Sequence, residues 1–200
     1  MSALFRNTAI GAAALGLCAG VAVPAQAAYV VTLQQVGANV VATGSGTIDL
    51  TGLTPTDTTN DFRSGIIPNT GAIAIGTPIF ENEDLYTGFS GPSSFGSGVG
   101  TFPSSSGSGD KVAIDGDLLA VPTGYISGHA LADTSIYDAA TFATLGVTPG
   151  TYEWTWGTGP DADSFTLQIG PVAVPEPASS LPLLVMGLAG LGLVLRTRRA

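Results

Sequence analysis

The stretch Thr151–Ile169, TYEWTWGTGPDADSFTLQI, decides the fold class of this chain. Two runs within it alternate large apolar residues with polar ones, and a turn-rich segment at 157–163 separates them. A period of two places one apolar row on one face of a strand, so we predict a hairpin with one apolar face. Its large residues are Tyr152, Trp154, Trp156, Phe165, Leu167 and Ile169. Each contributes roughly 1.5–3 kcal/mol when buried, which is enough for much of a small core.

The rest of the central region indicates the same class. Residues 29–36 and 40–50 are β-prone runs joined by Gly37-Ala38-Asn39, and they predict a second hairpin. Short strands are expected at 72–75 and 112–121, and one short helix at 135–145. No fixed-period repeat is visible, which argues against a solenoid or propeller. The prediction is an all-β fold, a compact β-sandwich-like passenger domain.

The two tryptophans of the first hairpin have two interpretations. Packing in the core is the simpler one, because both alternate with polar residues on the apolar side of a strand. Alternatively, Trp154 and Trp156 form a platform on which sugar rings stack.

Charge and cysteine content exclude several classes of function. Between residues 28 and 177 two basic residues, Arg63 and Lys111, stand against all fifteen acidic residues, a net charge of −13. Nucleic-acid binding depends on clustered Lys and Arg, so no nucleic-acid partner is expected. The single cysteine, Cys18, lies in the N-terminal apolar run described next, so the mature chain is expected to have no disulfide, no thiol nucleophile and no cysteine metal site. No cofactor is expected.

The N-terminal end has the pattern of a secretory signal peptide. Arg6 precedes an apolar run at 9–23 that is too short to span a bilayer comfortably. Ala25 and Ala27 supply the small side chains that signal peptidase accepts, so cleavage is predicted after Ala27. The expected partners are the secretory translocon and signal peptidase.

The C-terminal end carries a Val-Pro-Glu-Pro motif, Val174, Pro175, Glu176 and Pro177, followed by an almost wholly apolar stretch. Residues 178–195 contain no charge and would cover roughly 27 Å as a helix, close to the hydrocarbon thickness of a bilayer. The tail then carries three arginines, Arg196, Arg198 and Arg199. By the positive-inside rule these stay in the cytoplasm, so a single transmembrane helix would leave the domain outside it.

This order of motif, apolar span and arginines resembles the PEP-CTERM sorting signal of Gram-negative bacteria that make exopolysaccharide. The resemblance implies that an exosortase, a membrane cysteine enzyme, recognises the motif and sorts the protein to the cell surface. It implies exopolysaccharide or biofilm matrix as the surroundings, and says nothing about the activity of the passenger. The two prolines fit a processing site, because they keep the backbone extended and accessible.

The chain therefore divides into five predicted parts. These are a signal peptide at 1–27, a β-rich extracytoplasmic domain at 28–171, a motif and linker at 172–180, a transmembrane core at 181–195 (178–195 at most) and a basic tail at 196–200. The expected localisation is the inner membrane transiently, then the cell surface or the medium.

Chemical sites are sparse in the central domain. Asp110, Asp115 and Asp117 offer the oxygen ligands that Ca²⁺ prefers but match neither an EF-hand nor a nonapeptide array. We interpret them as solvated turn residues, with calcium as the alternative, and predict no metal site. Glu81, Glu83 and Glu153 are the carboxylates that a glycoside hydrolase would need, but no motif unites them.

The leading hypothesis is a non-enzymatic surface or matrix protein with a structural or adhesive role. The first alternative is a carbohydrate- or ice-binding protein, for which Thr47, Thr51 and Thr54 are candidates, although regular Thr-x-Thr ranks are missing. A secreted hydrolase is the second alternative, and no catalytic residues are proposed for it.

Overall fold

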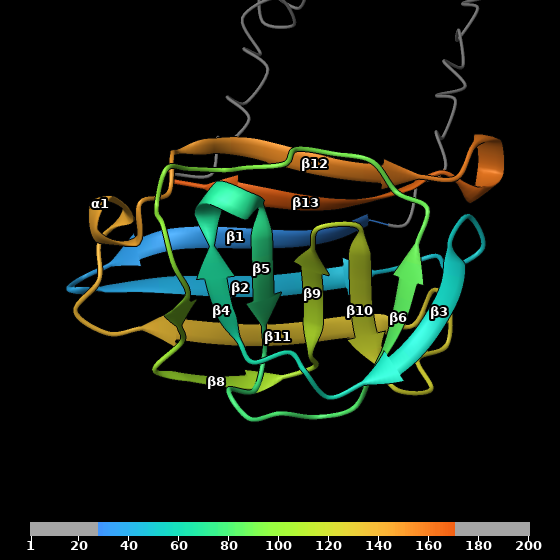
Figure 1. Ribbon diagram of the computed structural model, residues 1–200, viewed down its shortest axis with the longest axis horizontal. Coiled ribbons are helices and arrows are strands. Elements are labelled where there is room, and N and C mark those ends of the chain that lie inside the picture. The colour runs from blue at the N-terminus through green and yellow to red at the C-terminus, as the bar shows by residue number, and fades with distance from the viewer. Residues whose placement is uncertain (1–27, 171–200) are drawn as a thin grey trace, which may run out of the picture.

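The computed structural model describes residues 28–170, which form two β-sheets packed face to face. In Figure 1 the strands of the seven-stranded sheet lie in front and run across those of the six-stranded sheet behind. The predicted all-β, sandwich-like fold is confirmed. The predicted parts at 1–27 and 172–200 lie outside the described residues.

The six-stranded sheet has the order β12-β13-β1-β2-β11-β8. Its strands are β1 (Ala28–Val36), β2 (Asn39–Thr47), β8 (Ser106–Gly109), β11 (Ala130–Tyr137), β12 (Gly150–Trp156) and β13 (Asp163–Ile169). Both predicted hairpins, β1–β2 and β12–β13, are confirmed as antiparallel pairs. The parallel pair β1–β13 joins them, so the first and last described strands lie side by side.

The seven-stranded sheet has the order β3-β6-β10-β9-β5-β4-β7. Its strands are β3 (Thr54–Thr59), β4 (Gly65–Ile67), β5 (Ala72–Ile75), β6 (Glu83–Thr87), β7 (Phe102–Pro103), β9 (Val112–Asp115) and β10 (Leu118–Pro122). The short strands expected at 72–75 and 112–121 are present, and a turn divides the second into β9 and β10. Two 3-10 turns lie at Pro68–Thr70 and Gly159–Asp161.

The helix predicted at 135–145 is wrong over its first part. Residues up to Tyr137 belong to β11, because Ser135 and Tyr137 point into the core and the backbone pairs with β2. Only α1 (Phe142–Leu145) is helical. Thr141 caps its start through a capping box with Thr144, and Gly146 ends it in the left-handed region at φ 66°.

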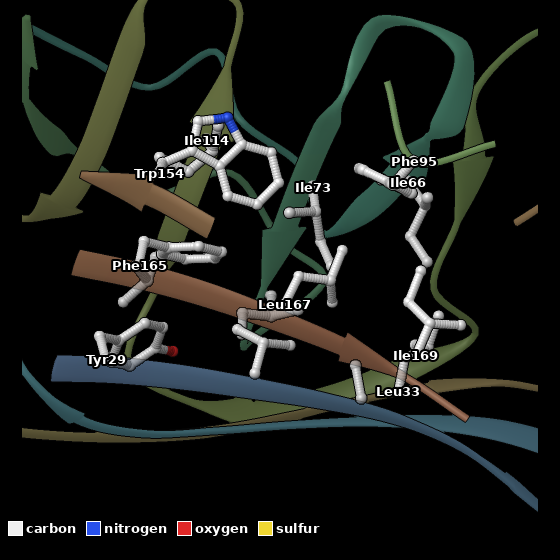
Figure 2. Close-up of a cluster of buried hydrophobic side chains, with 14 of the residues drawn as sticks. Tyr29, Leu33, Ile66, Ile73, Phe95, Ile114, Trp154, Phe165, Leu167 and Ile169 are labelled. Atoms are coloured by element: carbon white, nitrogen blue, oxygen red, sulfur yellow. The ribbon is translucent and has the colours of Figure 1, made fainter. Parts of the chain in front are cut away.

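The core lies between the sheets and contains the large residues of the β12–β13 hairpin. Figure 2 shows Trp154, Phe165 and Tyr29 in sequence across neighbouring strands. The ring centroids of Trp154 and Phe165 are 5.6 Å apart at an interplanar angle of 81°, an edge-to-face contact. Ile73 and Ile114 of the seven-stranded sheet belong to the same buried cluster. Apolar alternation on both sheets therefore supplies one shared core.

Candidate functional site

The residues predicted for sorting and topology lie outside the described part of the chain. They are Ala25, Ala27, Val174–Pro177, Arg196, Arg198 and Arg199. Their roles stay predictions of the sequence. Among residues 28–170, no helix has both the length and the apolar character needed to cross a membrane.

Trp154 and Trp156 are core residues, 2% and 4% exposed. The Trp156 indole N–H donates to the carbonyl of Asp49 at 2.7 Å. Ser90 exchanges two backbone hydrogen bonds with Thr155, at 3.0 and 2.8 Å, so the segment around Gly91 lies against the Trp154 ring. Neither indole presents a face to solvent, so this placement does not support the alternative of a sugar-stacking platform formed by the two rings.

The candidate calcium ligands are not brought together. Asp110 precedes β9 and accepts a hydrogen bond from the backbone N–H of Ala132 at 2.8 Å, whereas Asp115 and Asp117 lie at the opposite end of β9. In the part of the chain that the structure describes, no group of three or more His, Cys, Asp or Glu side chains is placed to hold a metal ion.

Of the candidate hydrolase carboxylates, Glu81 and Glu83 lie two residues apart, and Glu153 is separate from them. Glu83 is fully buried at the start of β6 in the seven-stranded sheet. Glu153 is exposed on β12 of the six-stranded sheet. These two carboxylates therefore do not share a site.

A row of polar side chains crosses the outer face of the six-stranded sheet. The strand registers align one outward-facing residue from each strand. In sheet order they are Thr151, Gln168, Thr32, Thr43, Thr134 and Ser108. We call this row the polar rung. With neighbouring strands about 4.8 Å apart, it extends over roughly 24 Å.

The polar rung is open and uncharged. Its members are exposed or half-buried. Within residues 28–170, one side-chain hydrogen bond joins two members of the rung: the Thr32 hydroxyl donates to the Thr43 carbonyl at 3.5 Å. Hydroxyl and amide groups both donate and accept, so the rung offers hydrogen bonds of both kinds to a partner.

The neighbouring row on the same face is mixed, with Glu153, Thr166, Val30, Ser45 and Ala132 in register. Glu153 stands on the edge strand β12, so the centre of the face carries no charge. This absence of charge contrasts with the strongly acidic composition of the domain.

Directly beneath the rung, the inner face of the same sheet buries a carboxyl group. The Tyr29 hydroxyl donates to Asp133 Oδ2, and both side chains are buried. Burial raises the pKa of Asp133 to about 7, although the hydrogen bond from Tyr29 opposes the rise. Gly44 makes room for this pair, because a Cβ there would overlap the Tyr29 hydroxyl and the Asp133 carboxylate.

Sequence reasoning did not find the polar rung, because its members come from six strands distant in the chain. The threonines named instead are dispersed. Thr47 ends β2, the Thr51 hydroxyl donates to Asp49 Oδ1 at 2.6 Å in a loop, and Thr54 begins β3 of the other sheet. The usable signal was the alternation in β13, which places Thr166 and Gln168 on the outward side.

Comparison with known families gives a match at the C-terminal end of the chain. The PEP-CTERM protein-sorting motif matches residues 173–199, a span that includes the Val-Pro-Glu-Pro sequence and the three arginines. The searches of curated proteins and of solved structures found no match. The chain thus carries a signal for export and for sorting by an exosortase, with the cell surface as its destination.

Proposed function

We propose that this chain, an exported protein with a PEP-CTERM sorting signal, is a non-enzymatic surface or matrix protein with a structural or adhesive role. The outer face of the six-stranded sheet is its adhesive surface. The observation that carries this proposal is the polar rung, an uncharged row of side chains aligned across all six strands.

The chemistry of the rung favours a neutral polysaccharide as the partner. Sugar hydroxyls donate and accept hydrogen bonds, as do the Thr, Ser and Gln side chains of the rung. A polyanion is disfavoured, because the domain has two basic and fourteen acidic residues between positions 28 and 170. An exopolysaccharide made of neutral sugars is therefore the expected ligand.

Ice binding is a second candidate supported by the same row. Hydroxyl groups repeating at the strand spacing of about 4.8 Å present an ordered set of partners to ordered water. Thermal hysteresis of the purified protein would distinguish this candidate, because a polysaccharide-binding face has no reason to depress the freezing point.

Adsorption to a neutral insoluble glucan tests the proposal. The mature protein is purified from its native cells and mixed with cellulose in 0.15 M salt. Thr43→Glu places a charge at the centre of the rung, and Thr54→Glu on the exposed edge strand β3 is the matched control. We expect Thr43→Glu to lower the bound fraction at least about tenfold, because one lost interaction of about 1.4 kcal/mol has that effect. Equal adsorption of wild type and both variants, or none by wild type, would contradict the proposal.

A further inference from the structure

The outer face of the seven-stranded sheet bears small side chains where the other sheet bears the polar rung. Strand registers align Gly65, Ala74, Ala113, Ala120 and Leu85 across five strands. We call this row the alanine rung. Apart from Leu85 these side chains are short, so they leave space above the sheet, and Phe62 covers part of it.

Beside Phe62 the space remains open as a cavity of about 250 Å³. Ala72 and Ala74 lie at its base, and Ile67 adds apolar surface. The charged, polar and aromatic residues that line it are Asp61, Phe62, Arg63, Phe80, Thr101 and Asp115. The Phe80 side chain is 59% exposed, so its ring is available for contact with a ligand in the cavity.

The walls of the cavity are fixed by a buried lysine. Lys111 is 2% exposed, and its ammonium group donates to the carbonyls of Ile79 at 2.6 Å and Phe62 at 3.4 Å. These carbonyls belong to the two segments that carry the aromatic walls. The Ser64 hydroxyl also donates to the carbonyl of Thr77 at 2.6 Å, and the carbonyl of Gly76 lies 3.0 Å from the same oxygen. The cavity is therefore held in place before any ligand arrives, which lowers the entropic cost of binding.

Residues 28–170 contain two basic residues, Arg63 and Lys111. Lys111 is buried, whereas Arg63 is exposed. No ion pair or hydrogen bond of the Arg63 side chain is found among the described residues. It shares the cavity with the carboxyl groups of Asp61 and Asp115. Burial raises the pKa of Asp115 above its usual value.

We propose that this cavity binds a single neutral sugar ring, as a chain end or side branch of a polysaccharide. Two phenylalanines offer apolar faces to the C–H surface of a pyranose, Arg63 donates to its hydroxyls, and Asp61 and Asp115 accept from them. At about 250 Å³ the cavity is smaller than the roughly 300–1,000 Å³ of sites for drug-sized ligands, which favours one ring over a longer segment. An acidic sugar fits less well, because two carboxylates stand beside the one guanidinium.

This inference goes beyond the proposed function and does not require it, because the cavity and the polar rung lie on the opposite outer faces of the sandwich. A ligand that fills the cavity would hold a polysaccharide at one point. The polar rung would instead contact a length of it.

Ligand-observed NMR with the purified mature protein tests the inference. The probes are the methyl glycosides of glucose, galactose and mannose, with methyl glucuronide as the charged comparison. We expect at least one neutral glycoside to bind and the glucuronide to bind more weakly. Phe80→Ala and Arg63→Gln should each weaken binding at least about tenfold, the effect of losing about 1.4 kcal/mol.

Two controls make the result specific. Val99→Ala removes an exposed apolar side chain, 82% exposed, that does not line the cavity, and it should leave binding unchanged. Thr43→Glu should also leave it unchanged, so failure of the polar rung and failure of the cavity give different results. The inference is overturned if no neutral glycoside binds, if Phe80→Ala and Arg63→Gln bind like wild type, or if the glucuronide binds more tightly.

Discussion

The two outer faces of this sandwich are built by the same alternation and yet differ in chemistry. Inward-facing residues of both sheets are large and apolar, and they form one core. Outward, the six-stranded sheet presents the polar rung to solvent, whereas the seven-stranded sheet presents the alanine rung, whose alanines are at most 6% exposed. Side-chain size accounts for the difference, because short side chains leave room for loops to pack above them.

Because of this difference, the two faces should respond differently to amino-acid substitutions. A substitution on the polar rung meets water, so it changes surface chemistry and little else. A substitution on the alanine rung meets Phe62 and its neighbours, so it changes packing. The comparison predicts that chemically similar substitutions have unequal effects on the two sheets.

The largest expected difference is between Ala113→Leu and Thr43→Leu. Ala113 is fully buried at the centre of the alanine rung, so the added carbons would overlap the side chains packed against this row and should cost about 2–3 kcal/mol of unfolding free energy. Thr43 is exposed, and Thr43→Leu should change stability by no more than about 0.5 kcal/mol. Urea denaturation of both variants measures this, and equal midpoints would show that the two faces are packed alike.

The pH dependence of stability reports on buried carboxyl groups in both sheets. Burial raises the pKa of Asp133 to about 7 in the six-stranded sheet. Burial also raises the pKa of Glu83 to about 7 in the seven-stranded sheet, although the charge of Lys111 opposes the rise. Unfolded carboxyls have pKa values near 4, so the folded state binds more protons between about pH 4 and pH 7. Stability should therefore fall as pH rises through that window.

We accordingly expect the melting temperature to be higher at pH 5 than at pH 8. Asp133→Asn should recover at least about 1 kcal/mol at pH 8, since one pKa unit corresponds to about 1.4 kcal/mol, and should change little at pH 5. Exposed Asp138→Asn is the matched control and should keep the full decrease. An Asp133→Asn protein that loses as much stability as wild type between pH 5 and pH 8 would contradict this assignment.

A smaller difference in unfolding free energy is expected between substitutions of Phe62 and Phe80, the two aromatic walls of the cavity. Phe62 is half-buried against the alanine rung, so Phe62→Ala should cost about 1–2 kcal/mol. Phe80 is mostly exposed, and Phe80→Ala should stay within about 0.5 kcal/mol. Thermal unfolding of both variants gives the measurement. A large loss for Phe80→Ala would assign that ring a packing role.

Local patterns in the sequence predicted the frame of the fold well. Both hairpins follow from period-two alternation and from turn residues such as Gly37, whose φ of 61° suits glycine. The short strand at 72–75 was visible in the alternation of alanine and isoleucine. The prediction of a helix over 135–145 was wrong for its first residues. Their local sequence is compatible with a helix or a strand, and pairing with β2 makes them a strand.

The candidate surfaces could not be predicted, because they depend on which strands become neighbours. The polar rung joins residues between Thr32 and Gln168, and its order follows from the pairing of β1 with β13 and of β11 with β8, strands that are distant in the sequence. The cavity joins Asp61, Phe80 and Asp115, each from a different segment. The burial of Trp154 depends on a glycine- and serine-rich segment that sequence patterns assign only as a loop.

The central claim is that the sorted protein adheres through the polar rung, and its retention in the matrix of living cells tests this most directly. Cells would carry wild type, Thr43→Glu or Thr54→Glu as the sole copy, and quantitative blotting would divide the protein between matrix and medium. We expect Thr43→Glu to move into the medium while wild type and Thr54→Glu stay in the matrix. If all three variants stay in the matrix to the same extent, the polar rung is not the adhesive surface.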